Sequence, residues 1–593
     1  MTKSWKVGGP AGYGIKTVGQ LFAYALMSKG YYVFLYPEYP SLIRGGHNTY
    51  QVEFSYNPIC SIDKNIDFLI AFDQLTIDMD LASLKKGGVV ICDSSCILPK
   101  RSDITVISLS FKEILDQAHL DFLLKNSLAI GASLALLGLK FTPKELLQVL
   151  NKKLGGDGSK NKADVAKILE NNVKAIEEGY KYVASKYGAI SEIKAVTKTA
   201  KALISGNEAI ALGAIQAGCK FYAAYPMTPA TSILEYLESK EKDAKIIVHQ
   251  AEDEIAAIHN ALGASTAGVR AMTGTSGGGF ALMNEAVSLS GMTETPVVIV
   301  EAMRSSPATG LPTWTGQDDL QFITHSGHGD FPRVILAPGN PSEAFQLTQD
   351  AFNLADVYQC PVFCLGDKYL GESQISTDTT DFNIVKTINR GKLLLKKTPK
   401  NYKRYELTAD GISARTIPGM ANGEFIANSD EHNEFGYSVE GYTDDRNQQM
   451  RKRMLKEKTL RNSIPLPKVY GPSKAKIGIV SWGSNWGTIL DVLKANQFKI
   501  TNKQLGNVLI NYVHFNYLYP LPVEKIKSLL KQYNYLILVE QNYTGQFGKL
   551  LAEETGIQME NKLLKYDGRP FFRQEILDFL TQEKLKSNPS YGI

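Results

Sequence analysis

Residues 221–237 read FYAAYPMTPATSILEYL and join a strand to a helix through a rigid corner. The apolar run that opens the stretch has the length of a buried strand, and the amphipathic run that closes it has helical spacing. Between them, Pro226 and Pro229 restrict the backbone around Thr228. Such a corner presents the threonine hydroxyl in one direction at the end of a strand, where α/β folds commonly bind ligands.

Three further strand-like runs in this part of the chain end in unusual residues. They are HQAEDEIAAIHNALGASTAG (249–268), where three acids precede a helix of small residues, MTGTSGGGFALMNEA (272–286), which has a glycine-rich turn, and VEAMRSSPATGLPTWTGQDDL (300–320), which places Arg304 in a loop. Taken singly, each is more often a helix cap, a packing turn or a surface charge. Because ligands collect at the carboxyl ends of strands in doubly wound sheets, the four ends together favour one shared site.

Alternating strand-like and helix-like runs extend through most of the 593 residues. This alternation is typical of βαβ units around a mostly parallel sheet, so we predict an α/β protein of three doubly wound units. The predicted domains are residues 1–190, 200–375 and 471–593. Residues 376–470 are polar and turn-rich and form a connecting region, whose basic run RNQQMRKRMLKEKTLR we expect to be a helix with a solvated face.

Composition argues against several classes of protein. The chain has 65 Lys and Arg residues and 60 Asp and Glu residues. The resulting net charge of +5 is too small to indicate a nucleic-acid or membrane-surface protein. The six cysteines form neither a disulfide framework nor a metal-ligand pattern, so we expect no metal site in this chain. No secretory signal and no membrane-spanning apolar run is visible, and we expect a cytoplasmic protein.

The first predicted domain opens on a glycine-dense loop, VGGPAGYGIKTVGQ (7–20), between a strand and a helix. Backbone N–H groups in such a loop can approach an anion, yet the pattern matches neither a dinucleotide fingerprint nor a P-loop. Two interpretations of this loop therefore remain: a phosphate-binding site, and a tight turn that binds no ligand. Downstream, YPEYPSLIRGGHNTYQVEFS (36–55) is expected to contain an Arg-Gly-Gly loop that forms an interface or a ligand rim.

At these residues the sequence resembles the alpha subunit of 2-oxoacid:ferredoxin (acceptor) oxidoreductases, in the form in which a gamma domain is fused ahead of alpha. The segment from GGPAGYG to RGGHNTYQV is similar to the gamma domain, and YPMTP with the Glu-Asp-Glu helix start is similar to the pyrimidine-binding domain of alpha. The segments VSWGSNWG, LYPLP, VEQNYTGQFG and YDGRPFF resemble a transketolase C-terminal-type domain. The likeness covers nearly the whole chain.

The resemblance implies half of an active site in this chain. Thiamine diphosphate would be bound between two subunits, and a separate beta subunit would hold its diphosphate, a Mg ion and an iron–sulfur cluster. In this chain GGDGSKNKADVAKILENN (155–172) resembles the Mg-diphosphate motif, but its spacing is about half that of the motif and we interpret it as a solvated turn. The family further implies CoA as co-substrate, ferredoxin as acceptor through beta, and a heterodimer or heterotetramer.

The resemblance also implies roles for single residues. Glu254, with Glu252 as the alternate, would contact the pyrimidine ring nitrogen. Thr228 and Arg304 would act on the 2-oxoacid, Thr228 through its hydroxyl and Arg304 by pairing with the carboxylate. The other implied residues are Tyr225 and Pro226 for the substrate, and Thr275, Ser276 and Gly277 for the cofactor. The loop after Arg304 has two serines where the family has glycines, a departure that could shift the arginine.

The resemblance leaves the substrate open. The fused layout favours 2-oxoglutarate, with pyruvate possible, and a second carboxylate would need a further cation. Arg270, Arg44, Lys16 and His325 are candidates for that role. Two other functions remain: a different thiamine-dependent enzyme of the transketolase type that is complete in one chain, and a non-catalytic scaffold subunit.

Overall fold

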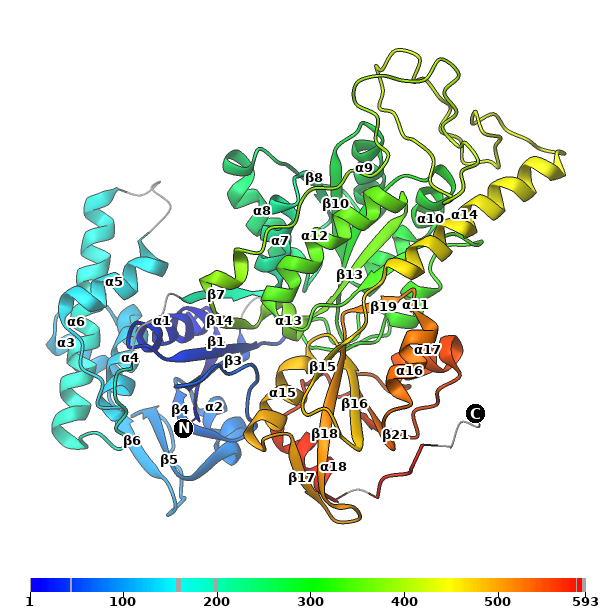
Figure 1. Ribbon diagram of the computed structural model, residues 1–593. Helices are drawn as coiled ribbons and strands as arrows, with labels where there is room; N and C mark the ends of the chain where they lie inside the picture. The colour runs from blue at the N-terminus through cyan, green and yellow to red at the C-terminus, as the bar shows by residue number, and fades with distance from the viewer. Residues whose placement is uncertain (1, 43–44, 156–160, 197–200, 583, 589–593) are drawn as a thin grey trace. The chain divides into compact units, whose positions relative to one another are not determined.

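The computed structural model describes residues 2–42, 45–155, 161–196, 201–582 and 584–588 (Figure 1). The chain divides into two compact units. Unit 1 consists of Met1–Leu203, Ser373–Thr379 and Phe572–Gln574, and unit 2 of Ile204–Glu372, Thr380–Phe571 and Glu575–Ile593.

Unit 1 is built on an eight-stranded sheet in the order β6-β5-β4-β1-β3-β2-β14-β7. Its strands are β1 (Thr2–Ala11), β2 (Tyr32–Glu38), β3 (Gly45–Ser55), β4 (Ile66–Ala71), β5 (Leu84–Asp93), β6 (Thr105–Leu109), β7 (Lys201–Ser205) and β14 (Gln374–Asp378). Its helices are α1 (Ile15–Ser28), α2 (Gln74–Asp80), α3 (Phe111–Gln117), α4 (Lys125–Leu136), α5 (Pro143–Leu154) and α6 (Lys162–Lys186).

Strand β3 corrects the loop expected within residues 36–55. It lies antiparallel between β1 and β2, so the sheet is mixed, whereas β1, β4, β5 and β6 are parallel as predicted. The run TYQVEF alternates polar and apolar residues, which is a strand signal that the neighbouring glycines and prolines obscured. Both faces of this run are buried. The polar side chains have hydrogen-bond partners within the protein, as in the bond that the Gln51 amide donates to the Glu53 carboxylate.

The segment that resembles a Mg-diphosphate motif is described only in part. Residues 156–160, which hold most of the expected solvated turn, lie outside the described residues. Gly155 caps the end of α5, and residues 162–172 belong to α6, whose start is capped by the Asn161 side chain.

Unit 2 contains a seven-stranded sheet in the order β19-β12-β13-β11-β10-β8-β9. Its strands are β8 (Cys219–Ala224), β9 (Ile247–Gln250), β10 (Arg270–Thr275), β11 (Val297–Met303), β12 (Val334–Leu336), β13 (Pro361–Asp367) and β19 (Tyr517–Tyr519). Helices α9 (Glu254–Thr266) and α10 (Gly277–Thr293) pack on one face, and α7 (Gly206–Gln216), α8 (Thr231–Ala244) and α12 (Pro341–Tyr358) pack on the other. The sheet is therefore doubly wound. Two short helices, α11 (Leu320–Thr324) and α13 (Lys368–Glu372), follow β11 and β13 along the chain.

A second sheet of unit 2 has six strands and shares a core with the first. Its strands are β15 (Lys468–Tyr470), β16 (Ile477–Trp482), β17 (Lys499–Asn502), β18 (Gly506–Phe515), β20 (Tyr535–Glu540) and β21 (Asn561–Leu564). The helices of this part are α15 (Asn485–Ala495), α16 (Val523–Leu530), α17 (Gln546–Thr555) and α18 (Arg573–Gln582). One buried cluster joins Phe280 and Ile299 to Trp482 and Leu538. The α/β class is confirmed, and the division of unit 2 into three domains stays a prediction.

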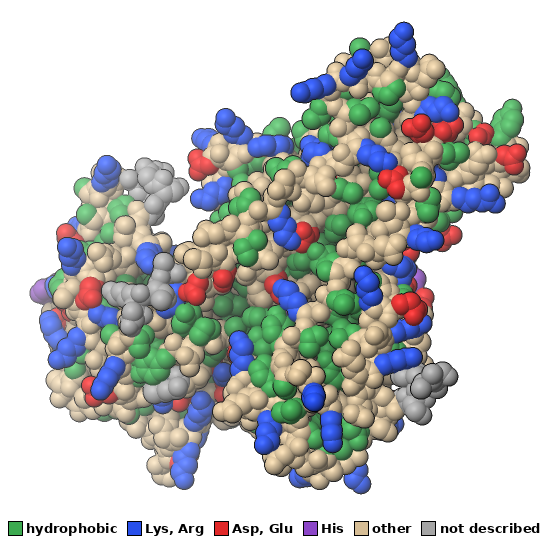
Figure 2. All heavy atoms as spheres, in the orientation of Figure 1, with side chains coloured by type: hydrophobic (Ala, Val, Ile, Leu, Met, Phe, Trp, Pro, Cys, Tyr) green, Lys and Arg blue, Asp and Glu red, His purple; other side chains and the backbone are tan. Residues whose placement is uncertain are grey.

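The surface carries charges of both signs. Figure 2 shows Lys and Arg side chains interspersed with Asp and Glu over the visible face, without one large basic field. Within the described residues, none of the helices combines the length and the apolar content needed to cross a membrane.

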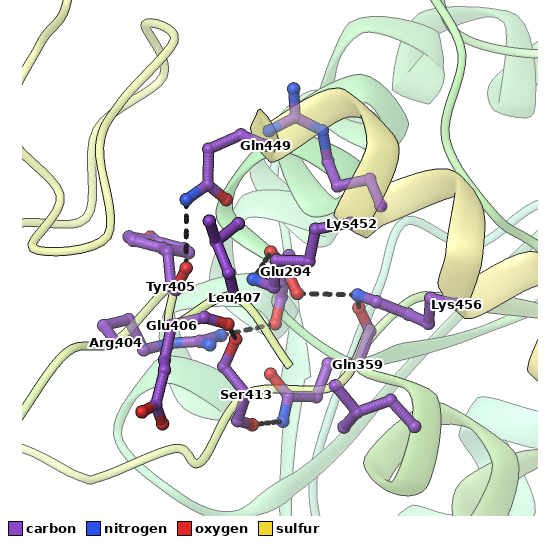
Figure 3. Close-up of polar contacts among 12 residues, drawn as sticks. Glu294, Gln359, Arg404, Tyr405, Glu406, Leu407, Ser413, Gln449, Lys452 and Lys456 are labelled. Atoms are coloured by element: carbon purple, nitrogen blue, oxygen red, sulfur yellow. Dashed lines mark hydrogen bonds and ion pairs between the residues drawn. The ribbon is translucent and has the colours of Figure 1, made fainter. Parts of the chain in front are cut away.

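The basic helix of the connecting region, α14 (Thr443–Ser463), corrects the expectation of a solvated face (Figure 3). Lys452 and Lys456 are buried, and their ammonium groups lie 2.6 and 2.7 Å from the two carboxylate oxygens of Glu294, just after α10. Arg404 donates to the main-chain oxygen of Glu294 at 2.8 Å. The basic run therefore serves partly to neutralise a buried acid.

Candidate active site

The four unusual strand ends meet at one edge of the seven-stranded sheet. Strands β11, β10, β8 and β9 are neighbours in this order, and each pair runs parallel. Their carboxyl ends therefore lie at the same edge, which is where doubly wound sheets bind ligands. Strand pairing thus gathers residues that the sequence spreads from the Thr228 corner to the Arg304 loop.

Glu254 is the first residue of α9, shortly after the end of β9. Asp253 caps this helix, because its carboxylate accepts a hydrogen bond from the Ala256 amide at 2.8 Å. The side chain of Glu254 is buried, and within the described part of the chain its Oε1 has no hydrogen-bond partner. Glu252, the alternate, is exposed. Burial and the unpaired oxygen therefore favour Glu254, and not Glu252, as the carboxylate that binds a ligand.

The glycine-rich turn after β10 lies against Glu254. A Cβ atom at Gly279 would lie 2.1 Å from Thr275 Oγ1 and 2.5 Å from Glu254 Oε1, so only glycine fits there. Ser276 is buried, and among the described residues its hydroxyl has no hydrogen-bond partner. The turn leads into α10 at Gly277, where the helix N-terminus offers free amide groups. A buried carboxylate, a buried hydroxyl and a helix N-terminus thus converge.

Arg304 and Thr228 are direct neighbours. Arg304 Nη1 donates to the main-chain oxygen of Thr228 at 2.9 Å, and Arg304 is 8% exposed. Tyr225, directly after β8, is exposed, whereas Pro226 and Thr228 are half-buried. The arginine and the corner therefore form one wall of the site, with the tyrosine at its rim.

The two serines after Arg304 stabilise its loop. Ser305 donates through its hydroxyl to the Thr315 main-chain oxygen at 2.8 Å, and Ser306 donates its amide to Asp318 at 3.0 Å. The loop therefore closes on itself, and the departure from the family's glycines leaves Arg304 beside Thr228.

Sequence reasoning missed Glu301 and Asp319. Both are buried. Burial lowers the pKa of the Arg304 guanidinium, and the nearby carboxyl groups of Asp319 and Glu301 oppose this shift only in part. Burial raises the pKa of Asp319 itself to about 6. The sequence did offer a signal for Glu301, because it stands inside the apolar run PVVIVEAM and an acid in a buried strand is rare unless it has a partner or a function. The local sequence pattern around Glu301 did not connect it with Asp319, which lies later in the chain.

Arg270 is not available as the cation for a second carboxylate. Its guanidinium is buried, forms an ion pair with Asp356 at 2.8 Å and donates to the Ala217 main-chain oxygen at 2.7 Å. Its donors are thus engaged inside the unit, and this candidate was wrong. Lys16 and His325 are exposed, and Arg44 lies outside the described residues.

The site fits a planar nitrogen heterocycle. The unpaired Glu254 oxygen can accept a hydrogen bond from a ring N–H, and a carboxylate is the side chain that holds a proton at a ring nitrogen. A buried carboxylate with an unpaired oxygen therefore suits the pyrimidine half of thiamine diphosphate.

Family models match most of the chain. A model described as "Pyruvate flavodoxin/ferredoxin oxidoreductase, thiamine diP-bdg" matches residues 212–452, which include the predicted Glu254, Thr228 and Arg304. A second, "Pyruvate ferredoxin/flavodoxin oxidoreductase", matches residues 4–182. The chain therefore contains a thiamine diphosphate-binding domain.

Named relatives and a solved structure agree with these models. The chain is 33% identical to the 2-oxoacid:ferredoxin oxidoreductase subunit alpha of Saccharolobus solfataricus, over 97% of each chain. It is 31% identical to the 2-oxoglutarate synthase subunit KorA of Methanothermobacter thermautotrophicus, over 64% of this chain and 98% of the relative. A structure of 2-oxoglutarate:ferredoxin oxidoreductase from Magnetococcus marinus, with 2-oxoglutarate, coenzyme A and succinyl-CoA bound, is 29% identical with a TM-score of 0.87, over 97% of this chain and 98% of that one.

The resemblance that the sequence motifs indicated is thus confirmed over almost the entire length. The chain belongs to the family of 2-oxoacid:ferredoxin oxidoreductase alpha subunits.

Proposed function

We propose that this chain supplies the pyrimidine-binding half of a thiamine diphosphate site in a cytoplasmic 2-oxoacid:ferredoxin oxidoreductase. The enzyme converts a 2-oxoacid and CoA to acyl-CoA and CO₂ and passes the electrons to ferredoxin. The observation that carries the proposal is the buried Glu254 carboxylate with an unpaired oxygen, at the edge where four parallel strands end.

The residues of this chain prepare the cofactor side of the site. Thiamine diphosphate, when bound, supplies the electron sink that lets a 2-oxoacid lose its carboxyl group. Glu254 holds a proton at the pyrimidine ring nitrogen, and Thr275, Ser276 and Gly277 line the same cradle. The buried setting strengthens the Glu254 hydrogen bond, because the local dielectric is low.

The substrate binds on the Arg304 wall. The guanidinium has donors left after its bond to Thr228, and it pairs with the substrate carboxylate through charge-assisted hydrogen bonds. The Thr228 hydroxyl bonds the substrate, while Tyr225 and Pro226 limit its position. The names of the relatives favour 2-oxoglutarate over pyruvate.

A separate beta subunit completes the site. We assign the diphosphate, the Mg ion and an iron–sulfur cluster to that subunit, in a heterodimer or heterotetramer, and ferredoxin accepts electrons from it. The designation of the relatives as subunit alpha supports this division.

The test is co-purification with the beta subunit, followed by a panel of 2-oxoacids. The complex is expected to reduce a viologen dye only with 2-oxoacid and CoA present, with a higher kcat/KM for 2-oxoglutarate than for pyruvate. The chain alone, given thiamine diphosphate and Mg, is expected to be inactive. Turnover by the chain alone would favour a complete transketolase-type enzyme, and an inactive complex would favour a scaffold.

We assign part of the CoA site to unit 1. Lys125, the first residue of α4, is 8% exposed, and its ammonium group lies 3.3 Å from the centre of the Tyr13 ring. Burial lowers its pKa to about 8, although Asp93 and Asp73 act in the opposite direction. Tyr13 belongs to the glycine-dense loop before α1, and among the described residues no side chain caps the N-terminus of α1 and no acid stands in its first turn. A phosphate group would pair with the ammonium group and with these free amides.

Lys125→Met is therefore expected to raise the KM for CoA about tenfold, since one charge-assisted contact is lost. The KM for the 2-oxoacid should not change, and steady-state kinetics of the complex measure both. Lys167→Met, at an exposed position of α6, is the matched control. An unaltered KM for CoA would remove Lys125 from this role.

A further inference from the structure

Two carboxyl groups that the proposed chemistry does not use lie close enough to Arg304 to act on its charge. Glu301 is in β11 and is 0% exposed, and Asp319, just before α11, is 8% exposed. In the described part of the chain neither oxygen of Glu301, nor Oδ2 of Asp319, receives a hydrogen bond from an N–H or hydroxyl donor. Buried polar atoms without partners are rare and call for an explanation.

The position of Asp319 is set by tight packing at the start of α10. A Cβ atom at Gly277 would lie 2.6 Å from Asp319 Oδ2, so glycine is required there to admit the carboxylate. The N-terminus of α10 favours a negative charge at this place. The helix N-terminus therefore opposes the effect of burial, which raises the pKa of Asp319.

Glu301 is in a different setting. It pairs in register with Thr275 in the neighbouring parallel strand, so both side chains point to the same face of the sheet. Its carboxyl group is within hydrogen-bonding reach of Asp319. Two buried carboxyl groups in contact do not both ionise, and a proton shared between one oxygen of each accounts for two of the three unpaired oxygens.

The surroundings decide which carboxyl group holds the proton. The charged groups that face the pair are Arg304, Asp318 and Asp367. Asp318 accepts from the Ser306 amide, and Asp367 accepts from the Ser484 hydroxyl at 2.6 Å. Burial raises the pKa of Glu301 well above its ordinary value, and burial raises that of Asp319 less, to about 6. Glu301 is thus the acid, and Asp319 is the carboxylate.

We propose that Glu301 and Asp319 are positioning residues: Glu301 carries a proton and donates it in a hydrogen bond to Asp319, and the Asp319 carboxylate is the counter-charge that keeps the Arg304 guanidinium beside Thr228. The pair presents one negative charge to one positive charge. This inference rests on the proposed role of Arg304 in binding the substrate carboxylate. It gives the arginine a fixed orientation before substrate arrives, which reduces the ordering cost of binding.

Conservative substitutions separate the two roles in the assembled complex. Glu301→Gln still donates to Asp319 and is expected to change the KM for the 2-oxoacid by less than about twofold. Asp319→Asn removes the only charge of the pair and is expected to raise that KM about tenfold, with kcat within about threefold.

The matched control is Asp330→Asn, at an exposed acid in the segment after α11. It is expected to leave the KM for the 2-oxoacid within about twofold. Equal damage from Glu301→Gln and Asp319→Asn would overturn the assignment, as would a wild-type KM in Asp319→Asn.

The pH dependence gives a second kinetic readout. In the wild type, the KM for the 2-oxoacid should rise as the pH falls below about 6, because Asp319 then takes up a proton. Asp319→Asn should lack this rise, while Glu301→Gln should retain it. A rise of the same size in Asp319→Asn would contradict the proposal.

Infrared difference spectroscopy tests the proton without turnover. At neutral pH the wild-type protein should show the carbonyl stretch of a buried protonated carboxylic acid that Glu301→Gln lacks. Absence of a difference between the two would overturn the protonation of Glu301 even if Asp319→Asn failed to fold. Because no substrate is involved, this result is independent of the proposed function, whose own failure would appear as an inactive complex.

Discussion

Glu254→Gln is expected to lower 2-oxoacid-dependent dye reduction by a factor of about 10² to 10⁴, while assembly with the beta subunit persists. The amide has nearly the same shape as the carboxyl group, so the packing against Gly279 and Thr275 is retained. It cannot take up and hold a proton at a ring nitrogen as a carboxylate does. The change therefore removes the chemical function of the residue and leaves its volume.

The measurement is initial-rate kinetics of the complex at saturating thiamine diphosphate, with assembly checked by size-exclusion chromatography. Glu252→Gln is the matched control, since this acid is two residues earlier and exposed. It is expected to retain activity within about twofold. Full activity of Glu254→Gln would refute the assignment, and loss of activity in both variants would indicate a general disturbance of the α9 start.

The second large effect is on stability. Glu294→Gln is expected to reduce the free energy of unfolding by about 3–5 kcal/mol, because it leaves buried cations without a partner. Glu294 is 0% exposed and is contacted by Lys452 at 2.6 Å and Lys456 at 2.7 Å (Figure 3). Its backbone is left-handed, with φ of 50°, and glutamine keeps the same side-chain size at this position. The loss of unfolding free energy in Glu294→Gln therefore measures the effect of the missing charge and not a change in backbone strain.

Urea unfolding of the chain measures this change. The variant Glu294→Gln with Lys452→Met and Lys456→Met is the compensated control, and it should recover much of the loss because the unpaired charges are gone. An equal loss in the single and the triple variant would contradict the assignment of the loss to unpaired charges.

The same ion pairs predict a pH dependence. Burial alone would raise the pKa of Glu294, but the ammonium groups of Lys452 and Lys456 outweigh it and hold the pKa well below the ordinary value of 4.5. Because the folded pKa is depressed, the stabilisation is fully present above pH 4.5 and is lost as the pH falls below that value towards the folded pKa. In acid unfolding curves, Glu294→Gln should lack this part of the transition.

Local patterns in the sequence were sufficient for much of the fold. Each strand expected in residues 200–375 is present, because apolar runs bounded by glycine, proline and charged residues depend on nearby neighbours alone. The corner at Thr228 and the acids before α9 were identifiable for the same reason. The missed strand β3 shows the limit, since the Gln51 amide on its polar face is satisfied by partners elsewhere in unit 1.

What the sequence determined by itself was the α/β class, the family and the chemical groups at each strand end. Only the tertiary structure decided which of those groups meet. It placed Arg304 beside Thr228 and Asp319 against Gly277, and it buried Lys452 against Glu294, from which it is 158 positions away along the chain. The physical reason is that propensity and periodicity act over a few residues, whereas ion pairing and desolvation act through space between residues that chain order does not relate.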